Sequence, residues 1–200
     1  MVDSAFHEEI RTITEDFDPT VFHNRGFLVT GGAGFLGSWI CECLVALGGK
    51  VICLDNMATG LQENIVYLAA HPNFVFLDRD VTQKISGKFD YVLHLASRAS
   101  PEEYQQHPIE TLLANSEGTK NVLELARKSE ATVLFTSTSE VYGDAQIIPT
   151  PETYNGNVSP NGIRSCYDEG KRFGEALCAA YRRQFDLNVR VARIFNSYGA

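Results

Sequence analysis

Apolar residues in this chain alternate between short unbroken runs and longer stretches with helical spacing. The short runs predict buried β-strands at residues 27–29, 51–54, 74–77, 91–95, 133–135 and 189–194. Helical spacing fills residues 38–47, 109–127 and 167–185. Because strands and helices take turns along the chain, we expect an α/β fold, with a doubly wound parallel sheet that carries helices on both faces.

The first 24 residues precede this alternation. Apolar residues recur there at the spacing of one helix face: Phe6, Ile10, Ile13 and Phe17. We therefore expect residues 1–24 to form a helical extension that packs on the domain or on a second subunit. Residues 25–200 are predicted to form the main domain.

The composition is that of an ordinary globular protein, with 44% hydrophobic and 21% charged residues. The formal net charge of −8 argues against a nucleic-acid partner. No apolar run approaches the roughly 20 residues needed to cross a membrane, so we expect no membrane partner. The five cysteines show neither a disulfide nor a zinc pattern, and we therefore expect a cytoplasmic protein without a metal site.

A glycine-rich turn joins the first predicted strand to the helix that follows it. Residues 30–37 read TGGAGFLG. Gly31 would make the tight turn, Gly34 would let the backbone approach a pyrophosphate, and Gly37 would let helix and strand pack closely. Phosphates would then lie at the helix N-terminus, where free N–H groups favour negative charge. The pattern is typical of a Rossmann dinucleotide-binding fold, and a purely structural turn is the alternative.

Asp55 stands at the end of the second predicted strand, roughly 20 residues beyond the glycines. A carboxylate at this place accepts hydrogen bonds from an adenosine ribose and repels a 2′-phosphate. The sequence therefore predicts NAD, rather than NADP, as the cofactor. A solvated acid at a strand end is the alternative interpretation.

Tyr167 and Lys171 lie four residues apart in the last predicted helix, so their side chains share one face. A nearby ammonium group favours the phenolate, and we expect Lys171 to lower the pKa of Tyr167. The result would be a base that takes a hydroxyl proton near neutral pH. This spacing also occurs by chance.

A hydroxyl-rich segment follows the predicted strand at 133–135. Residues 136–143 read TSTSEVYG, and we expect them at the ligand edge of the sheet, where hydroxyls can bind a substrate hydroxyl. Burial of Glu140 there would be costly unless it had a role. The alternative is a Ser/Thr-rich turn with a solvated glutamate.

Together, the segments TGGAGFLG, CLDN, HLAS, TSTSEVYGD and YDEGK resemble the extended short-chain dehydrogenase/reductase family, in its NAD-dependent epimerase/dehydratase group. Within it, residues 157–198, with SCYDEGKR and VRVARIFNSYG, are similar to the UDP-glucuronate decarboxylases. The resemblance covers residues 25–200. It implies that a nucleotide-sugar substrate, UDP-glucuronate, is oxidised at its 4-hydroxyl, loses carbon dioxide from the 4-ketone, and is reduced to UDP-xylose while NAD is regenerated.

The resemblance also implies a role for individual residues. The catalytic set would be Thr138, Ser139, Glu140, Tyr167 and Lys171. The cofactor would contact Gly31, Gly34, Phe35, Leu36, Gly37, Asp55, Asn56, Thr59, Gly60, Asp80, Val81, Leu95, Ser97, Tyr167 and Lys171. The nucleotide sugar would contact Tyr104, Glu140 and Asn196.

The pair Ser139–Glu140 distinguishes the related activities. By the same resemblance, 4,6-dehydratases have Asp-Glu at these positions, and their aspartate protonates the leaving hydroxyl, for which serine is a poor substitute. Sugar 4-epimerases usually lack the glutamate, so the pair favours decarboxylation. A 4-epimerase or 4,6-dehydratase is the nearest alternative, and an NAD-binding fragment without turnover is an alternative of another class.

The resemblance also bears on assembly. It implies a homodimer joined through the helices at 109–127 and 167–185. It further implies a smaller C-terminal substrate lobe, and we expect most of this lobe to be missing, because the sequence stops at Ala200, directly after a predicted strand.

Overall fold

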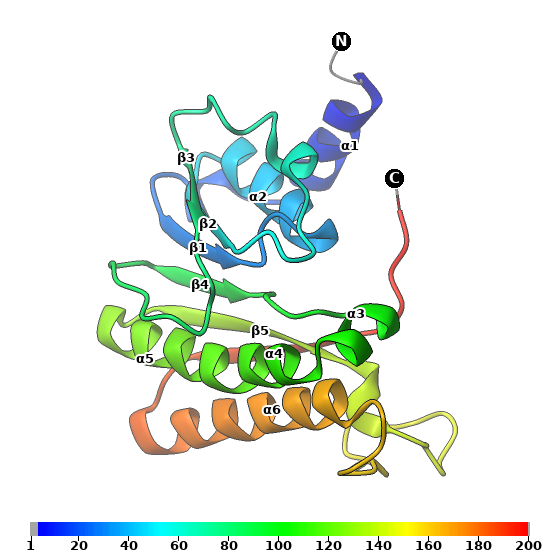
Figure 1. Ribbon diagram of the computed structural model, residues 1–200. Helices are drawn as coiled ribbons and strands as arrows, with labels where there is room; N and C mark the ends of the chain where they lie inside the picture. Colours follow the sequence, from blue (N-terminus) through cyan, green and yellow to red (C-terminus); the bar gives the residue numbers. More distant parts are fainter. Residues whose placement is uncertain (1–3, 200) are drawn as a thin grey trace.

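The computed structural model describes residues 4–199, and within them six parallel strands form one sheet in the order β3-β2-β1-β4-β5-β6 (Figure 1). The strands are β1 (Gly26–Thr30), β2 (Lys50–Asp55), β3 (Phe74–Asp78), β4 (Tyr91–His94), β5 (Thr132–Thr138) and β6 (Val189–Ile194). The predicted doubly wound α/β fold is therefore confirmed. Ala200 lies outside the described residues.

Side chains of the central strand alternate between two cores. Leu28 packs among residues of α5 (Thr119–Ser129) and α6 (Ser165–Phe185), whereas Phe27 and Val29 pack against α2 (Phe35–Ala46). Successive residues of a strand point to opposite faces of its sheet, so a continuous apolar run feeds both cores. Figure 1 shows the sheet between α2 on one side and α5 and α6 on the other.

The predicted helix at 109–127 is interrupted. It consists of α4 (Pro108–Leu113), a π-helical turn (Ala114–Gly118) and α5. Another short helix, α3 (Pro101–Gln106), precedes it and was not predicted. Apolar spacing cannot reveal a π turn, because the extra residue changes the hydrogen bonds and leaves the chain helical.

Three of the element boundaries that differ from the prediction lie near the expected site. Helix α2 begins at Phe35, directly after its N-cap Gly34, three residues earlier than expected. Helix α6 begins at Ser165. Strand β5 continues to Thr138, so residues 136–138 belong to the strand and pair with residues 192–194 of β6. The hydroxyl-rich segment thus begins within the sheet. The short 3₁₀ turns are Pro19–Val21, Gln62–Ile65 and Ser139–Tyr142.

Helix α1 (Ser4–Glu15) packs on α2. Ile10 is buried, but Ile13 and Phe17 are 44% and 49% exposed, and the side chain of Phe6 lies outside the described part. Phe17 follows the end of the helix and contacts the ring of Phe22 edge-on. The domain boundary at residue 24 stays a prediction.

Two kinds of feature are not found among residues 4–199. No helix there combines the length and the apolar character that a membrane crossing requires. No three His, Cys, Asp or Glu side chains in the same range gather in a way that could hold a metal ion.

Candidate functional site

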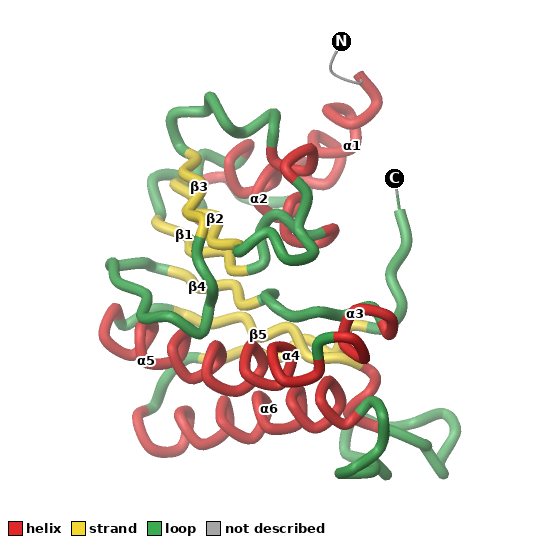
Figure 2. Tube along the Cα trace, in the orientation of Figure 1, coloured by secondary structure: helices red, strands yellow, loops and turns green. Residues whose placement is uncertain are grey.

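The strand order switches direction between β1 and β4, and we call the region beyond the carboxyl ends of these two strands the crevice. Strand β1 pairs with β2 on one side and with β4 on the other. The turn after β1 and the segment after β4 touch, since a Cβ atom on Gly31 would lie 2.7 Å from the backbone nitrogen of Ala96. Ligands of doubly wound sheets bind at such a switch in strand order. In Figure 2 the strands are yellow, and the loops that follow their carboxyl ends are green.

The glycine turn has the geometry that a diphosphate needs. Gly31 has φ = +72°, a left-handed conformation that favours glycine. A Cβ atom on Gly37 would overlap the carbonyl oxygen of Gly31, so helix and turn are in direct contact. At Gly34 a Cβ atom would meet only that carbonyl oxygen, at 3.3 Å, and would otherwise face open space. A ligand can therefore approach the backbone at Gly34. Phe35 and Leu36 form the first turn of α2 beside it.

Asp55 ties the end of β2 to the glycine turn. Its Oδ2 accepts a hydrogen bond from the N–H of Ala33 at 3.0 Å, and its Oδ1 accepts one from the N–H of Met57 at 2.9 Å. Burial raises the pKa of Asp55. A carboxylate has about four acceptor positions, so Asp55 keeps capacity for a ribose hydroxyl. Gly60 packs directly on Asp55, where a Cβ atom would lie 3.0 Å from Oδ1.

The predicted cofactor residues that follow Asp55 include members of two loops, one after β2 and one after β3, which a hydrogen bond connects. Asn56 donates from Nδ2 to Asp80 at 2.6 Å, and Asp80 also accepts from the N–H and hydroxyl of Thr82. Burial raises the pKa of Asp80, but these hydrogen bonds outweigh it and the net pKa is lowered. Thr59 is exposed, whereas the side chain of Val81 is buried in the core. Only the backbone of Val81 is thus placed to face a ligand.

Tyr167 lies in a stack of two phenol rings. The rings of Tyr104 and Tyr167 are parallel within 6°, with centroids 5.1 Å apart, and both residues are buried. The Cys166 thiol donates to the Tyr104 carbonyl and so joins α3 to the start of α6. Thr138, the last residue of β5, hydrogen-bonds to the side chain of Tyr167. The structure therefore brings three predicted site residues together.

The expectation that Lys171 lowers the pKa of Tyr167 is wrong for this structure. Burial raises the pKa of Tyr167, and the hydrogen bond from Thr138 lowers it only in part. The Lys171 ammonium instead donates to the carbonyl of Thr136 at 2.8 Å and lies 6.0 Å from the centre of the Tyr167 ring. Burial also lowers the pKa of Lys171 to about 8, which weakens the positive charge available to the phenol.

Glu140 forms an ion pair with a residue that the sequence did not single out. The carboxylate of Glu140 contacts the guanidinium of Arg164, which also lies 3.9 Å from Asp168. The acid is therefore neither a lone solvated glutamate nor buried without a partner. Arg164 stands one helical turn before Asp168, and this spacing was the only available sequence signal. Ser139 is half-buried beside Glu140.

Several buried polar atoms around Tyr167 have no hydrogen-bond partner within the described residues. They are the Tyr104 hydroxyl, Oδ1 of Asp168, and both side-chain polar atoms of Asn115. Asn115 belongs to the π turn and packs against Gly170 of α6. Burial raises the pKa of Asp168 to about 6. Buried polar groups are ordinarily paired, so a polar ligand fits this place.

His94 supports the site from within the sheet. Its Nδ1 lies 2.7 Å from the Thr30 hydroxyl, and its Nε2 lies 3.0 Å from the Thr119 hydroxyl. Thr119 itself donates to the carbonyl of Asn115, so it accepts from Nε2–H of the histidine. Burial lowers the pKa of His94 to about 3. The imidazole is thus a neutral structural link between β1, β4 and α5.

The remaining predicted residues occupy the same edge with fewer contacts. Leu95 and Ser97 are half-buried and follow β4, and the N–H of Leu95 donates to the carbonyl of Thr30. Asn196 is exposed, two residues beyond Ile194, which pairs with Thr138. The structure does not bring the side chain of Asn196 to Tyr167 through any hydrogen bond among the described residues.

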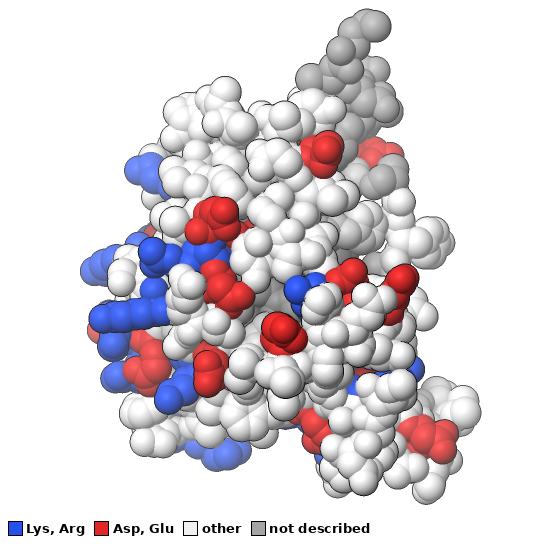
Figure 3. Space-filling model, in the orientation of Figure 1, with Lys and Arg blue, Asp and Glu red and all other residues white. Residues whose placement is uncertain are grey.

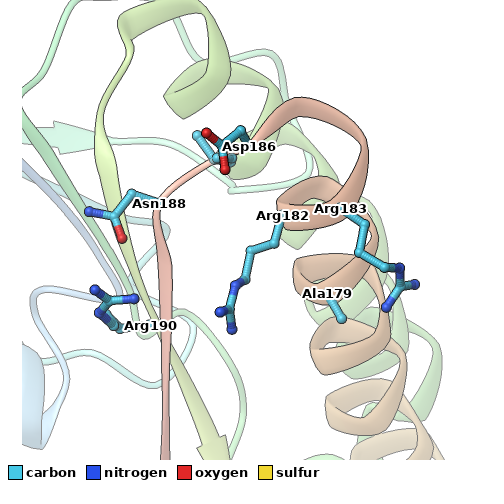
Figure 4. A pocket seen from close by; sticks show the side chains of 7 residues that line it. Ala179, Arg182, Arg183, Asp186, Asn188 and Arg190 are labelled. Atoms are coloured by element: carbon cyan, nitrogen blue, oxygen red, sulfur yellow. The ribbon is translucent and has the colours of Figure 1, made fainter.

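Two hollows lie at the opposite, amino edge of the sheet. One, of about 600 Å³, is lined by Ala179, Arg182, Arg183, Asp186, Leu187, Asn188 and Arg190. Figure 4 shows Arg182 reaching into the space between α6 and β6, while Arg183 lies on the other side of the helix. The other surrounds the starts of β1, β2, β4 and β5. Neither contains a predicted site residue, and parallel sheets bind ligands at the carboxyl edge, so we place the site in the crevice.

Comparisons with known proteins find a family model and similar sequences. The family model described as "NAD dependent epimerase/dehydratase family" matches residues 27–200. UDP-glucuronic acid decarboxylase 1 of Xenopus tropicalis is 44% identical over 193 residues, which cover 94% of this chain and 46% of that protein. UDP-glucuronic acid decarboxylase 1 of Arabidopsis thaliana is 49% identical over 172 residues, covering 86% of this chain and 40% of that protein.

A solved structure has a similar fold. UDP-glucose 4-epimerase from Brucella ovis, in complex with NAD, superimposes with a TM-score of 0.72 at 25% identity, over 88% of this chain and 53% of that one. The present chain therefore spans about half the length of the curated relatives and of the solved structure that it matches.

Proposed function

Because the chain belongs to the NAD dependent epimerase/dehydratase family, we propose that its crevice serves the NAD-dependent decarboxylation of UDP-glucuronate to UDP-xylose. The observation that carries the proposal is the position of Ser139 and Glu140. They follow β5 directly and lie beside the Thr138–Tyr167 pair, at the ligand edge of the sheet. The names of the similar decarboxylases support the same activity.

The family is NAD-dependent, and this chain has residues that fit the dinucleotide. The open backbone at Gly34 and the first turn of α2 would hold its diphosphate, and Asp55 would accept from its adenosine ribose. Asp55 also disfavours the 2′-phosphate of NADP. When bound, NAD supplies a reversible two-electron oxidation of the sugar at carbon 4.

Tyr167 is the proposed base for the 4-hydroxyl of the sugar. The phenolate takes the hydroxyl proton, and the Thr138 hydroxyl orients the substrate and hydrogen-bonds to the phenolate. Burial raises the pKa of Tyr167, so the base form is scarce near neutral pH in the structure as it stands. Lys171 lies 6.0 Å from the centre of the ring and donates to the carbonyl of Thr136, so it holds the end of β5 beside the base.

Loss of carbon dioxide follows oxidation, because the 4-ketone is β to the carboxylate. The C5–carboxylate bond breaks and its electron pair forms an enolate at carbons 4 and 5, which Tyr167 stabilises by returning its proton to the oxygen. Glu140 and Ser139 position the water that protonates carbon 5, while the enol oxygen returns its proton to Tyr167 and the ketone forms again. Reduction of the resulting ketone completes UDP-xylose, so no net redox change occurs.

Mass analysis of the product tests the proposal. The protein is incubated with UDP-glucuronate and NAD⁺, and the nucleotide-sugar fraction is weighed. Loss of carbon dioxide supports decarboxylation, whereas an unchanged mass with altered stereochemistry indicates epimerisation and loss of water indicates dehydration. NAD⁺ binding without any product would contradict the proposed reaction and indicate that the protein is an NAD-binding module.

The proposed partner is a second copy of the chain. Large apolar side chains are exposed on α4 and α6, which pack side by side: Ile109 at 70%, Leu112 at 43%, Leu113 at 38% and Phe173 at 49%. Apolar side chains gathered in this way favour association. The cytoplasmic location also stays a prediction, and it rests on five cysteines that are all unpaired.

A further inference from the structure

Arg98 lies at the crevice without a role in the reaction described above. It follows the half-buried segment 95–97 at the carboxyl end of β4, opposite the glycine turn across the β1–β4 boundary. Its side chain is only 17% exposed. Its Nη1 donates to Glu103 of α3 at 2.6 Å, and its charge also acts on Asp80 beyond the end of β3. Arg98 is thus paired with α3, and its charge acts on the loop after β3.

The surroundings of Arg98 are poor in available positive charge. Nearby Arg79 donates to the carbonyl of Lys84, Arg164 is paired with Glu140, and Lys171 is buried against the carbonyl of Thr136. Most Lys and Arg side chains on the visible face lie toward the amino edge of the sheet (Figure 3). Of these four cations, Arg98 is the one that follows the segment in contact with the glycine turn, two residues beyond Ala96.

We propose that Arg98 is a specificity-determining residue that binds a diphosphate group in the crevice, with Glu103 holding its guanidinium in place until the ligand arrives. The inference rests on the proposed function, because it places a dinucleotide or a nucleotide sugar in this crevice. A guanidinium presents a planar set of donors that matches phosphate oxygens, which an ammonium does not. The N-terminus of α2 provides donors from the opposite side.

The ion pair with Glu103 suits such an exchange. The Glu103 side chain is 39% exposed, so water can solvate its carboxylate when the guanidinium turns to the ligand. A diphosphate carries more negative charge than one carboxylate and therefore competes for Arg98. Glu103 accordingly lowers the affinity for the ligand by competing with it.

Binding titrations test the inference without requiring turnover. NAD⁺ and UDP are titrated separately by calorimetry into the wild type, Arg98→Gln, Arg98→Lys and Glu103→Gln, with adenosine as the ligand that lacks phosphate. We expect Arg98→Gln to weaken at least one diphosphate ligand by tenfold or more, Arg98→Lys to restore part of the loss, and Glu103→Gln to tighten the same ligand severalfold. Adenosine affinity should not change.

The two arms identify the source of the diphosphate. An effect on NAD⁺ alone assigns Arg98 to the cofactor, and an effect on UDP alone assigns it to the nucleotide sugar. Equal affinities of wild type and Arg98→Gln for both ligands would overturn the inference, as would weaker binding by Glu103→Gln. If Arg98→Gln does not fold, as judged by circular dichroism, Glu103→Gln still decides. A wild type that binds NAD⁺ but releases no carbon dioxide would refute the proposed function alone.

Discussion

At the scale of single residues, Tyr167 shows how burial and catalysis oppose each other. Stacking on Tyr104 removes the phenol from water and raises its pKa, although a base needs the phenolate. We predict that Tyr167→Phe lowers turnover by about 10²–10⁴-fold, the usual contribution of a general base. NAD⁺ affinity should stay within about twofold, because the ring and its packing are kept; calorimetry and a product assay measure the two quantities.

Tyr104→Phe is the matched control for Tyr167→Phe. It keeps the stacked ring and removes only the hydroxyl that lacks a partner in the described part of the chain. We expect this change to raise KM for the nucleotide sugar more than it lowers kcat. A Tyr167→Phe protein that retains most of its activity would remove Tyr167 from the role of base.

Asp168 makes stability depend on pH in a defined direction. Its pKa rises from 3.8 to about 6 on folding, so the folded state disfavours the charged carboxylate. Asp168 therefore does not lower the stability of the folded state below about pH 4, and stability is lost as pH rises through 6. Two pKa units correspond to at most about 3 kcal/mol. We predict that Asp168→Asn has a higher free energy of unfolding than the wild type at pH 8, by about 1–2 kcal/mol.

Urea unfolding of both proteins at pH 4 and pH 8 measures this effect. The difference between them should become small at pH 4, where the folded carboxyl is protonated and the carboxyl of the unfolded chain is only about half ionised. An advantage of the same size at both pH values would mean that charge is not its cause.

At the scale of elements, the turn between β1 and α2 separates two roles of glycine. Gly37→Ala puts a Cβ atom onto the Gly31 carbonyl, so we predict a loss of stability of about 1–3 kcal/mol or more, as for other overpacked sites. Gly34→Ala meets only ordinary or slightly tight contacts, so it should fold with a similar melting temperature. It should nevertheless weaken NAD⁺ binding by at least tenfold, because the methyl group occupies the approach to the backbone.

Thermal unfolding and NAD⁺ titration of the two variants distinguish these roles. If Gly34→Ala binds NAD⁺ as tightly as the wild type, the diphosphate does not lie at this turn. If Gly37→Ala is fully stable, the close contact between helix and turn can relax.

The elements that sequence reasoning found were those with local signals. Residue type and spacing were enough to identify Gly31, Gly34 and Asp55, and each has the predicted place in the fold. The strands were found because they are buried on both faces and so appear as continuous apolar runs. The predicted range of strand β5 was too short. Its last three residues are Ser or Thr, and they pair only with β6, which lies far along the sequence.

The features that were missed depend on contacts between distant segments. The raised pKa of Tyr167 comes from burial beside Tyr104 of α3, and the partner of Glu140 is Arg164 at the start of another element. Neither contact has a signature in the local sequence. Asn115 of the π turn packs against Gly170 of α6, a distant segment, and its side-chain atoms have no hydrogen-bond partner within residues 4–199.

At the scale of the whole molecule, the exposed apolar residues of α4 and α6 form the proposed contact with a second copy of the chain. We predict a homodimer in solution that Leu112→Glu combined with Phe173→Glu converts to a monomer, because burying two carboxylates in an apolar interface is costly. Analytical ultracentrifugation measures the change. Ile163→Glu is the control, since Ile163 is 75% exposed but lies before α6. A wild-type monomer, or a dimer that survives the double change, would contradict the prediction.

The strand order also divides the molecule into two consecutive halves that meet at β1 and β4. Strands β3, β2 and β1 come from residues 26–78, and strands β4, β5 and β6 from residues 91–194. A cut in the connection between β3 and β4 would therefore give two fragments, each with three neighbouring strands. Their shared boundary is the crevice itself, so a ligand that touches both sides would favour their reassembly by mass action. This chain is consequently suited to a split reporter, in which fragment complementation reads out the concentration of the dinucleotide.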